Sequence, residues 1–357
     1  MGASTNDSRG ESSEPLRIGI NGFGRIGRSV LRASLEHDDL DVVAVNDVMD
    51  DDDMAYLLQY DSVHGRLDGV FREGDTMYVG SQEIQLYSEP DPSEIPWDAV
   101  DVSVVLEATG LFRTRDEASQ HLEAGADQVL ISAPPKGDEP VPMFVYGVNH
   151  ETYDGEAIVS NASCTTNSVA PVMKTLDEAF GIDSGLLLTV HAYTGSQGLV
   201  DGPLEKRRRG RAAAENIVPT TTGAAIATTE ILPELEGTFD GRAMRVPVPD
   251  GSISDLTLNL ETDVTEADVA DAVRTAADGR LAGVLGYTDD EIVSQDVVGL
   301  PIPSYVDLES LMVVDDDMLK ILVWYDNEYG FSRQLLDLAA YVASEGDHVA
   351  TGAAVAH

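Results

Sequence analysis

The sequence predicts an α/β protein of two domains, in which a parallel sheet with crossover helices is followed by an α+β domain on a mostly antiparallel sheet. The length of 357 residues exceeds the usual size of one domain. In the first part, short β-branched apolar runs alternate with helix-length segments, which is typical of parallel strands. From about residue 164 the pattern changes to strands interrupted by two or three helices, and this favours a sheet covered on one side.

The first domain is expected over residues 16–163. Its strands are predicted at the apolar runs LRIGI (16–20), DVVAVN (41–46), DVSVVLEA (101–108) and QVLISA (128–133). The segment DEASQHLEAGA (116–126) has a helix-like pattern. Residues 1–15 are polar and lack the apolar core of a signal peptide, so we predict a disordered tail there.

The second domain is expected over residues 164–330. It opens with the helix candidate CTTNSVAPVMKTLDEAFG, and the strand-like runs GLLLTVHAYT, SDLTLNLET and LKILVWYDNEYGF follow. Amphipathic stretches at 265–277 and 289–294 lie between them. A last helix, at about 331–346, has apolar residues at helical spacing and is predicted to pack back on the first domain, ahead of a tail at 347–357.

The charge of the chain is extreme. Sixty-four acidic residues against 22 basic ones give a formal net charge of −42. Because screening cations relieve such self-repulsion, we predict a host with molar intracellular salt; an acidic protein from ordinary salt is the alternative. No basic stripe could release phosphate counterions, and no apolar window is long enough to span a bilayer, so neither nucleic acid nor a membrane is an expected partner.

A glycine motif follows the first predicted strand. Gly22, Gly24 and Gly27 form GxGxxG with a helix-like segment behind it, and Asp47 stands at the end of the next strand. This is the pattern of a Rossmann dinucleotide-binding domain, in which the glycines allow a tight turn and close approach of a pyrophosphate to a helix N-terminus. Asp47 would accept from ribose hydroxyls, and a carboxylate there disfavours a 2′-phosphate, which indicates NAD rather than NADP.

The chain has one cysteine, Cys164, which excludes an intrachain disulfide and a multi-cysteine metal cluster. No metal site is predicted, and a reducing cytoplasm is the expected location. Cys164 is placed at a helix start, where the macrodipole and free N–H groups favour the thiolate. An inert buried thiol is the alternative.

The expected base is His191, at the end of an apolar strand and just before an irregular loop. A structural histidine at a strand end is the alternative. The remaining histidines have no comparable neighbourhood: four lie in the first domain (His37, His64, His121, His150), and two lie near the C-terminus (His348, His357).

These residues sit in strings that together resemble the glyceraldehyde-3-phosphate dehydrogenase family, of the bacterial-like and eukaryotic-like kind. The strings occur in the family's order between about 16 and 345: INGFGRIGR, SNASCTTN, HAYT, RAAAENIVPTTTGAA, RVPVPDGSIS and WYDNEYGFS. The resemblance implies an NAD-dependent homotetramer that oxidises glyceraldehyde 3-phosphate and adds inorganic phosphate. It implies a thioester on Cys164 with His191 as the base.

The resemblance also implies binding residues, position by position. Around the cofactor they are Arg25 and Ile26 at the pyrophosphate, Thr109, Gly110 and Ser132 at strand ends, and Asn327 at the carboxamide. For the substrate phosphate they are Thr194 and Arg245, with Arg211 near, and for inorganic phosphate Ser163, Thr165, Thr222 and Gly223. Pro203 resembles the NAD-using members, although NADP remains possible as a secondary cofactor. Pro90 departs from the family's arginine at the adenine side, and the cluster from Lys206 to Arg209 could serve phosphate or a subunit interface equally well.

Three rival functions remain at this stage. Erythrose-4-phosphate dehydrogenase shares the scaffold and the nucleophile, but its loop after the catalytic histidine differs from HAYTGSQ. A semialdehyde dehydrogenase uses the same sulfur chemistry with a different cysteine neighbourhood. The third is a cofactor-sensing binding protein without catalysis, which would not require the candidate catalytic and phosphate-binding residues found here.

Overall fold

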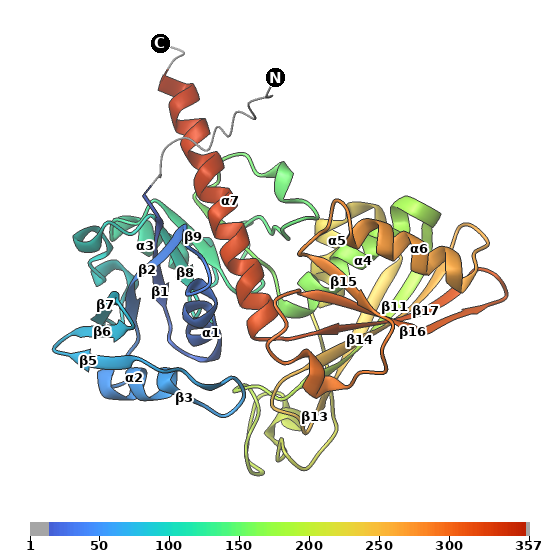
Figure 1. Ribbon diagram of the computed structural model, residues 1–357, viewed down its shortest axis with the longest axis horizontal. Helices are drawn as coiled ribbons and strands as arrows, with labels where there is room; N and C mark the ends of the chain where they lie inside the picture. The colour runs from blue at the N-terminus through green and yellow to red at the C-terminus, as the bar shows by residue number, and fades with distance from the viewer. Residues whose placement is uncertain (1–13, 355–357) are drawn as a thin grey trace, which may run out of the picture.

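The computed structural model describes residues 14–354, with side chains described up to residue 345. Two large sheets make up most of this range, and the long helix α7 (Tyr329–Ala354) runs between them (Figure 1). The predicted N-terminal tail falls outside the described residues, apart from Glu14 and Pro15. No helix in the described range has both the length and the apolar character needed to cross a bilayer.

The first sheet has eight strands in the order β10-β9-β8-β1-β2-β7-β6-β5. Its parallel strands are β1 (Leu16–Asn21), β2 (Leu40–Asn46), β7 (Gln82–Tyr87), β8 (Val104–Glu107), β9 (Gln128–Ile131) and β10 (Ile158–Ser160). Two antiparallel strands close one edge: β5 (Val70–Glu73) and β6 (Thr76–Val79). The helices of this half are α1 (Arg25–Ser34), α2 (Asp51–Gln59) and α3 (Arg115–Glu123), and a small hairpin pairs β3 (Tyr60–Asp61) with β4 (Gly65–Arg66).

This half is the predicted Rossmann fold, because strands that are buried on both faces alternate with helices. Ile18, Ile20 and Leu106 are fully buried in the middle of the sheet. The same apolar cluster includes Leu335 and Leu338 of α7, so the last helix of the chain covers the first sheet. α7 continues to Ala354, which corrects the predicted helix end near 346 and the predicted tail from 347.

The second sheet has seven strands in the order β12-β13-β11-β14-β17-β16-β15. The strands are β11 (Ile182–Ala192), β12 (Val218–Thr220), β13 (Phe239–Val246), β14 (Ser252–Leu260), β15 (Leu285–Thr288), β16 (Ser304–Val314) and β17 (Met318–Tyr325). Four of the six neighbouring pairs are antiparallel, and the parallel pairs are β11 with β13 and β15 with β16. The prediction of a mostly antiparallel sheet is therefore confirmed.

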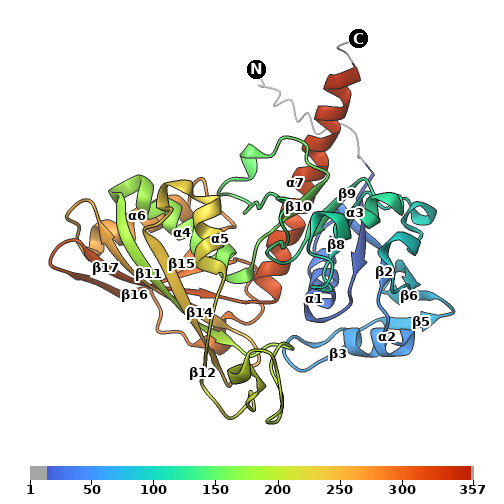
Figure 2. The same cartoon turned by 180° about the vertical axis from the view of Figure 1, so that it is seen from behind.

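Three helices cover one face of this sheet: α4 (Cys164–Phe180), α5 (Ala224–Ile231) and α6 (Glu266–Ala277), as Figure 2 shows from behind. Their apolar side chains join those of β14 and β17 in one core. The amphipathic stretch at 289–294 is not a helix. Hydroxyl and carboxylate side chains bind its backbone instead: Thr288 accepts the N–H of Asp290 at 2.9 Å, and Asp296 accepts that of Val293 at 2.8 Å.

Candidate active site

A cavity of about 670 Å³ opens between the two halves of the protein. Arg25, Ile26 and Ser132 line it from the first sheet and its helices. Six other predicted site residues line the cavity from the second half of the chain: Ser163, Cys164, His191, Thr194, Arg245 and Asn327. One space therefore joins the end of the Rossmann sheet to the start of α4.

The glycine loop is shaped by close backbone approach. Gly22 has φ +96°, and a Cβ there would lie 2.6 Å from the backbone nitrogen of Thr109. A Cβ on Gly27 would meet the carbonyl oxygen of Gly22 at 2.1 Å, whereas one on Gly24 would meet nothing within 4 Å. The loop thus has the tight turn and close helix contact that the motif requires, and Gly24 leaves open space where a pyrophosphate would approach.

Asp47 lies at the end of β2, beside this loop. Its carboxylate accepts the backbone N–H of Phe23 at 2.6 Å and that of Met49 at 2.9 Å. Asp47 therefore holds the loop in place, in addition to the ribose contact predicted for it.

Arg25 ion-pairs with Asp61 and Glu328, and its Nε lies 2.8 Å from Glu328 Oε1. The predicted pyrophosphate contact thus also joins the two halves of the chain.

A buried polar network behind the loop was missed by sequence reasoning. The carboxylate of Glu107, at the end of β8, accepts from the amide of Asn21 at 2.6 Å and from the backbone N–H of Thr109 at 2.8 Å. His121 Nε2 lies 3.2 Å from the same carboxylate, and His121 Nδ1 accepts from the indole of Trp97 at 3.1 Å. This network fixes the turn of Thr109 and Gly110. Each member looks ordinary in sequence, since the partners are far apart along the chain.

Cys164 is the first residue of α4, as predicted, and it is partly exposed. The hydroxyl of Ser163 caps the helix by accepting the N–H of Thr166 at 3.1 Å. Cys164 Sγ lies 3.4 Å from His191 Nε2, at the end of β11. The structure therefore places the lone thiol and the strand-end histidine in contact.

The protonation of this pair differs from the prediction. Burial raises the pKa of the Cys164 thiol, although Arg245 and hydrogen bonds from Thr165 act in the opposite direction. Burial, followed by the positive charge of Arg245, lowers the pKa of His191 to about 3. A helix start alone thus does not keep the thiolate here, because desolvation outweighs it. Both shifts favour a neutral thiol beside a neutral imidazole.

A neutral imidazole carries its proton on one nitrogen. His191 Nδ1 lies 2.8 Å from the carbonyl oxygen of Ala192 and 3.0 Å from Arg245 Nη1, and Arg245 Nη1 donates to the same carbonyl at 2.8 Å. We assign the proton to Nδ1, because it can then donate to that carbonyl. Nε2 is left free to accept the proton of Cys164.

The predicted phosphate ligands fall into two groups. Thr194 and Ser163 line the cavity with Arg245, whose buried Nε has no partner among the described residues. The other positions lie outside the lining. The hydroxyl of Thr165 is buried against that of Tyr325 at 2.9 Å, and Arg211 turns outward to Asp201 at 2.8 Å.

The last two positions lie at the start of α5. Thr222 accepts the N–H of Ala224 at 3.1 Å, and Gly223 is the N-cap of the helix. The helix start leaves backbone N–H groups there without helical partners, as an anion site requires. Neither residue lines the cavity.

Two further cofactor positions are held by hydrogen bonds. Ser132 donates to the carbonyl of Glu107 at 2.9 Å. Asn327 Oδ1 accepts from the hydroxyl of Ser252 at 2.6 Å, and this hydroxyl accepts the N–H of Ala192 at 3.1 Å. Ser252 was not predicted. It links the catalytic histidine's strand end to Asn327 and leaves the amide NH₂ of Asn327 as the donor for a ligand.

The loop that can cradle a dinucleotide and the thiol that can attack a carbonyl open into one cavity, and this defines a class: dinucleotide-dependent aldehyde oxidoreductases with a cysteine nucleophile. Residues 16–115 match the family model "Glyceraldehyde 3-phosphate dehydrogenase, NAD binding domain", and residues 163–327 match the C-terminal domain of the same family. The chain belongs to the glyceraldehyde-3-phosphate dehydrogenase family.

Curated relatives agree over nearly the whole length. The chain is 60% identical to the glyceraldehyde-3-phosphate dehydrogenase of Haloarcula vallismortis, over 92% of this chain and 99% of the relative. It is 50% identical to that of Geobacillus stearothermophilus, over 93% and 99%. For glyceraldehyde-3-phosphate dehydrogenase A of Escherichia coli K12 the identity is 48%, over 92% and 99%.

Proposed function

We propose that the protein catalyses the phosphorylating oxidation of D-glyceraldehyde 3-phosphate to 1,3-bisphosphoglycerate with NAD. The observation that carries this proposal is the contact of 3.4 Å between Cys164 Sγ and His191 Nε2, inside the cavity that the Rossmann domain shares. The open space at Gly24 and the free amide donor of Asn327 fit a dinucleotide there. Bound NAD supplies the hydride acceptor.

In the first half-reaction, the sulfur of Cys164 bonds to the aldehyde carbon while His191 Nε2 takes the thiol proton. That proton passes to the carbonyl oxygen and gives a hemithioacetal. His191 then takes the hydroxyl proton as the hydride leaves carbon, and a thioester remains on Cys164. The Nδ1–H bond to Ala192 keeps Nε2 aimed at the sulfur through each step.

In the second half-reaction, an oxygen of inorganic phosphate attacks the thioester carbon and the sulfur leaves as thiolate. Arg245 lies close enough to lower the pKa of Cys164, so the same charge stabilises the departing sulfur. The thiolate then recovers a proton from His191, which restores the neutral pair.

We infer that Arg245 and Thr194 bind the substrate phosphate, with Arg211 near. The unpartnered Nε of Arg245 supports this, because a buried guanidinium donor calls for an acceptor. We place inorganic phosphate near Ser163, Thr165, Thr222 and Gly223, where the starts of α4 and α5 offer N–H groups.

Initial rates of NADH formation in molar KCl test the proposal. Glyceraldehyde 3-phosphate should turn over fast only when inorganic phosphate is present. Faster turnover of erythrose 4-phosphate, or equal rates without phosphate, would overturn it. The same assay with NADP tests whether that cofactor serves as a secondary one.

We also propose a homotetramer in a cytoplasm of high salt, serving glycolysis or gluconeogenesis. The face of the second sheet opposite α4, α5 and α6 exposes apolar side chains such as Leu186, which is 65% exposed, and this supports an interface there. Light scattering in molar KCl should give four chains per particle, and monomers would contradict it. Melting temperature should rise from millimolar to molar KCl, since screening relieves the charge of −42.

A further inference from the structure

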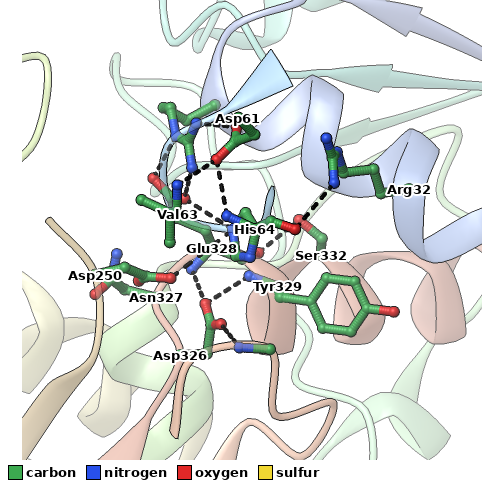
Figure 3. A network of polar contacts seen from close by, with 12 residues as sticks. Arg32, Asp61, Val63, His64, Asp250, Asp326, Asn327, Glu328, Tyr329 and Ser332 are labelled. Atoms are coloured by element: carbon green, nitrogen blue, oxygen red, sulfur yellow. Dashed lines mark hydrogen bonds and ion pairs between the residues drawn. The ribbon is translucent and has the colours of Figure 1, made fainter. Parts of the chain in front are cut away.

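A cluster of three acidic side chains and one histidine joins the two halves of the protein beside the cavity (Figure 3). His64 comes from the loop after β3, and Asp250 comes from the turn between β13 and β14. Asp326 and Glu328 follow β17, on either side of Asn327. None of the four has a part in the reaction described above.

Asp250 is the anomaly of the cluster. It is 2% exposed, and neither of its carboxylate oxygens has a hydrogen-bond partner among the described residues. A buried carboxylate without a partner is strongly unfavourable unless a proton or a cation neutralises it. Among the described residues, His64 is the one basic side chain within ion-pairing distance of Asp250.

The neighbours of Asp250 are arranged as ligands would be. His64 Nε2 lies 3.8 Å from Asp250 Oδ2, and one ligand atom each from His64, Asp250 and Asp326 lies within 4.8 Å of the others. Ligand atoms around an ion with bonds of about 2.1 Å are separated by roughly 3–4 Å, so a small inward shift would suffice. His64 Nε2 also lies 3.1 Å from Glu328 Oε2, so an ion would take the place of this hydrogen bond (Figure 3).

Asp326 is held firmly in position. One oxygen accepts the backbone N–H groups of Glu328 at 2.7 Å and Tyr329 at 2.6 Å, and the other accepts that of Gly299 at 2.6 Å. Hydrogen bonds of this kind orient carboxylate ligands in metal sites. Glu328 is less available, because Arg25 already pairs with it.

We propose that His64, Asp250 and Asp326 bind a divalent cation that accepts both imidazole and carboxylate ligands, such as Mn²⁺ or Zn²⁺. The ion neutralises Asp250 and ties the loop of His64 to the segment that carries Asn327. It is a structural site, because it lies outside the residues that line the cavity around Cys164.

Mn²⁺ binding to the chelator-treated full-length protein tests the site, in molar KCl to suppress diffuse binding by the acidic surface. Electron paramagnetic resonance should show one tightly bound Mn²⁺ per chain. Saturating Mn²⁺ should raise the melting temperature by about 5 °C. Asp250→Asn should lose both effects. If that variant folds poorly, His64→Gln replaces it in the test, and it should weaken both effects.

Asp263→Asn is the matched control, because Asp263 is exposed and forms no ion pair in the described range. It should bind Mn²⁺ like the wild type. Equal loss in this control, or unchanged binding in Asp250→Asn, would overturn the site. Absence of Mn²⁺ and Zn²⁺ binding, with Asp250→Asn at least as stable as the wild type, would show that Asp250 and Asp326 merely share a proton. Stabilisation by K⁺ alone would overturn the choice of ion.

Discussion

Two buried histidines, His191 and His121, differ in what their second ring nitrogen meets. In His121, Nδ1 accepts from Trp97 and Nε2 then donates to Glu107, so protein groups engage both nitrogens. In His191, Nδ1 is engaged by Ala192, while Nε2 meets the thiol of Cys164 at the cavity. The two rings therefore carry their proton on opposite nitrogens.

Burial by itself therefore says little about the role of a histidine. The fully buried His121 has carboxylate and indole partners, and it stabilises the turn that carries Thr109. His191 is nearly as buried, and burial together with the charge of Arg245 lowers its pKa, which favours a neutral acceptor. What marks the catalytic histidine is a ring nitrogen that meets the reactive thiol at a cavity.

Replacing the partner of His191 should have the largest effect. We expect Cys164→Ser to lower the rate of NADH formation by about 10⁴-fold or more, because a hydroxyl beside a neutral imidazole is a far weaker nucleophile than the thiol. The melting temperature should hardly change. Stopped-flow detection of the acyl-enzyme measures the step directly, and thioester formation in this variant would refute the mechanism. With Cys164 the only thiol, labelling of the native protein should report this one site.

His191→Gln should lower kcat by about 10²–10⁴-fold, since the general base is lost while the shape is kept. Its pH dependence of stability is also diagnostic. With a folded pKa of about 3 against 6.5 for an ordinary histidine, the unfolded chain takes up a proton that the native state refuses. His191 therefore costs stability as pH falls from about 6.5 toward 3. Between about pH 7 and pH 4, thermal melts should show the variant losing less stability than the wild type.

The same substitution at His121 should act on stability instead. We expect His121→Gln to reduce the free energy of unfolding by about 2–4 kcal/mol, because it leaves buried Trp97 and Glu107 groups without well-placed partners. Denaturant melts measure the loss. The kcat of the folded protein at saturating NAD should stay within a few-fold. A kcat loss as large as that of His191→Gln would end the distinction between the two histidines.

The smallest effect is expected at Ser252, which acts on the site through Asn327 and through the backbone N–H of Ala192. Ser252→Ala removes the donor to Asn327 Oδ1 and frees the amide to rotate. We expect kcat/KM for NAD to fall about 10-fold, roughly the worth of one hydrogen bond. Ser252→Thr, which keeps the hydroxyl, should recover much of it. If only the KM for the aldehyde changed, and kcat/KM for NAD stayed the same, a positioning role for Ser252 would be refuted.

Much of this molecule was predictable because it depends on local pattern. Alternating apolar runs indicated the Rossmann strands, and the glycine spacing placed the loop before α1. The hydroxyl residues around Cys164 marked the start of α4. The stretch at 289–294 shows the limit, since its amphipathic pattern was overridden by side chains that bind the backbone.

The sequence by itself determined the family, the fold class, and the identity of the thiol and its histidine. Only the tertiary structure decided their protonation, since desolvation and the charge of Arg245 come from elements far apart in the chain. It also decided which polar residues act together: Asn21 with Glu107 and His121, and His64 with Asp250. Spacing along the sequence does not reveal such sets, because only folding brings their members together. Burial then sets the strength of the electrostatic interactions among them.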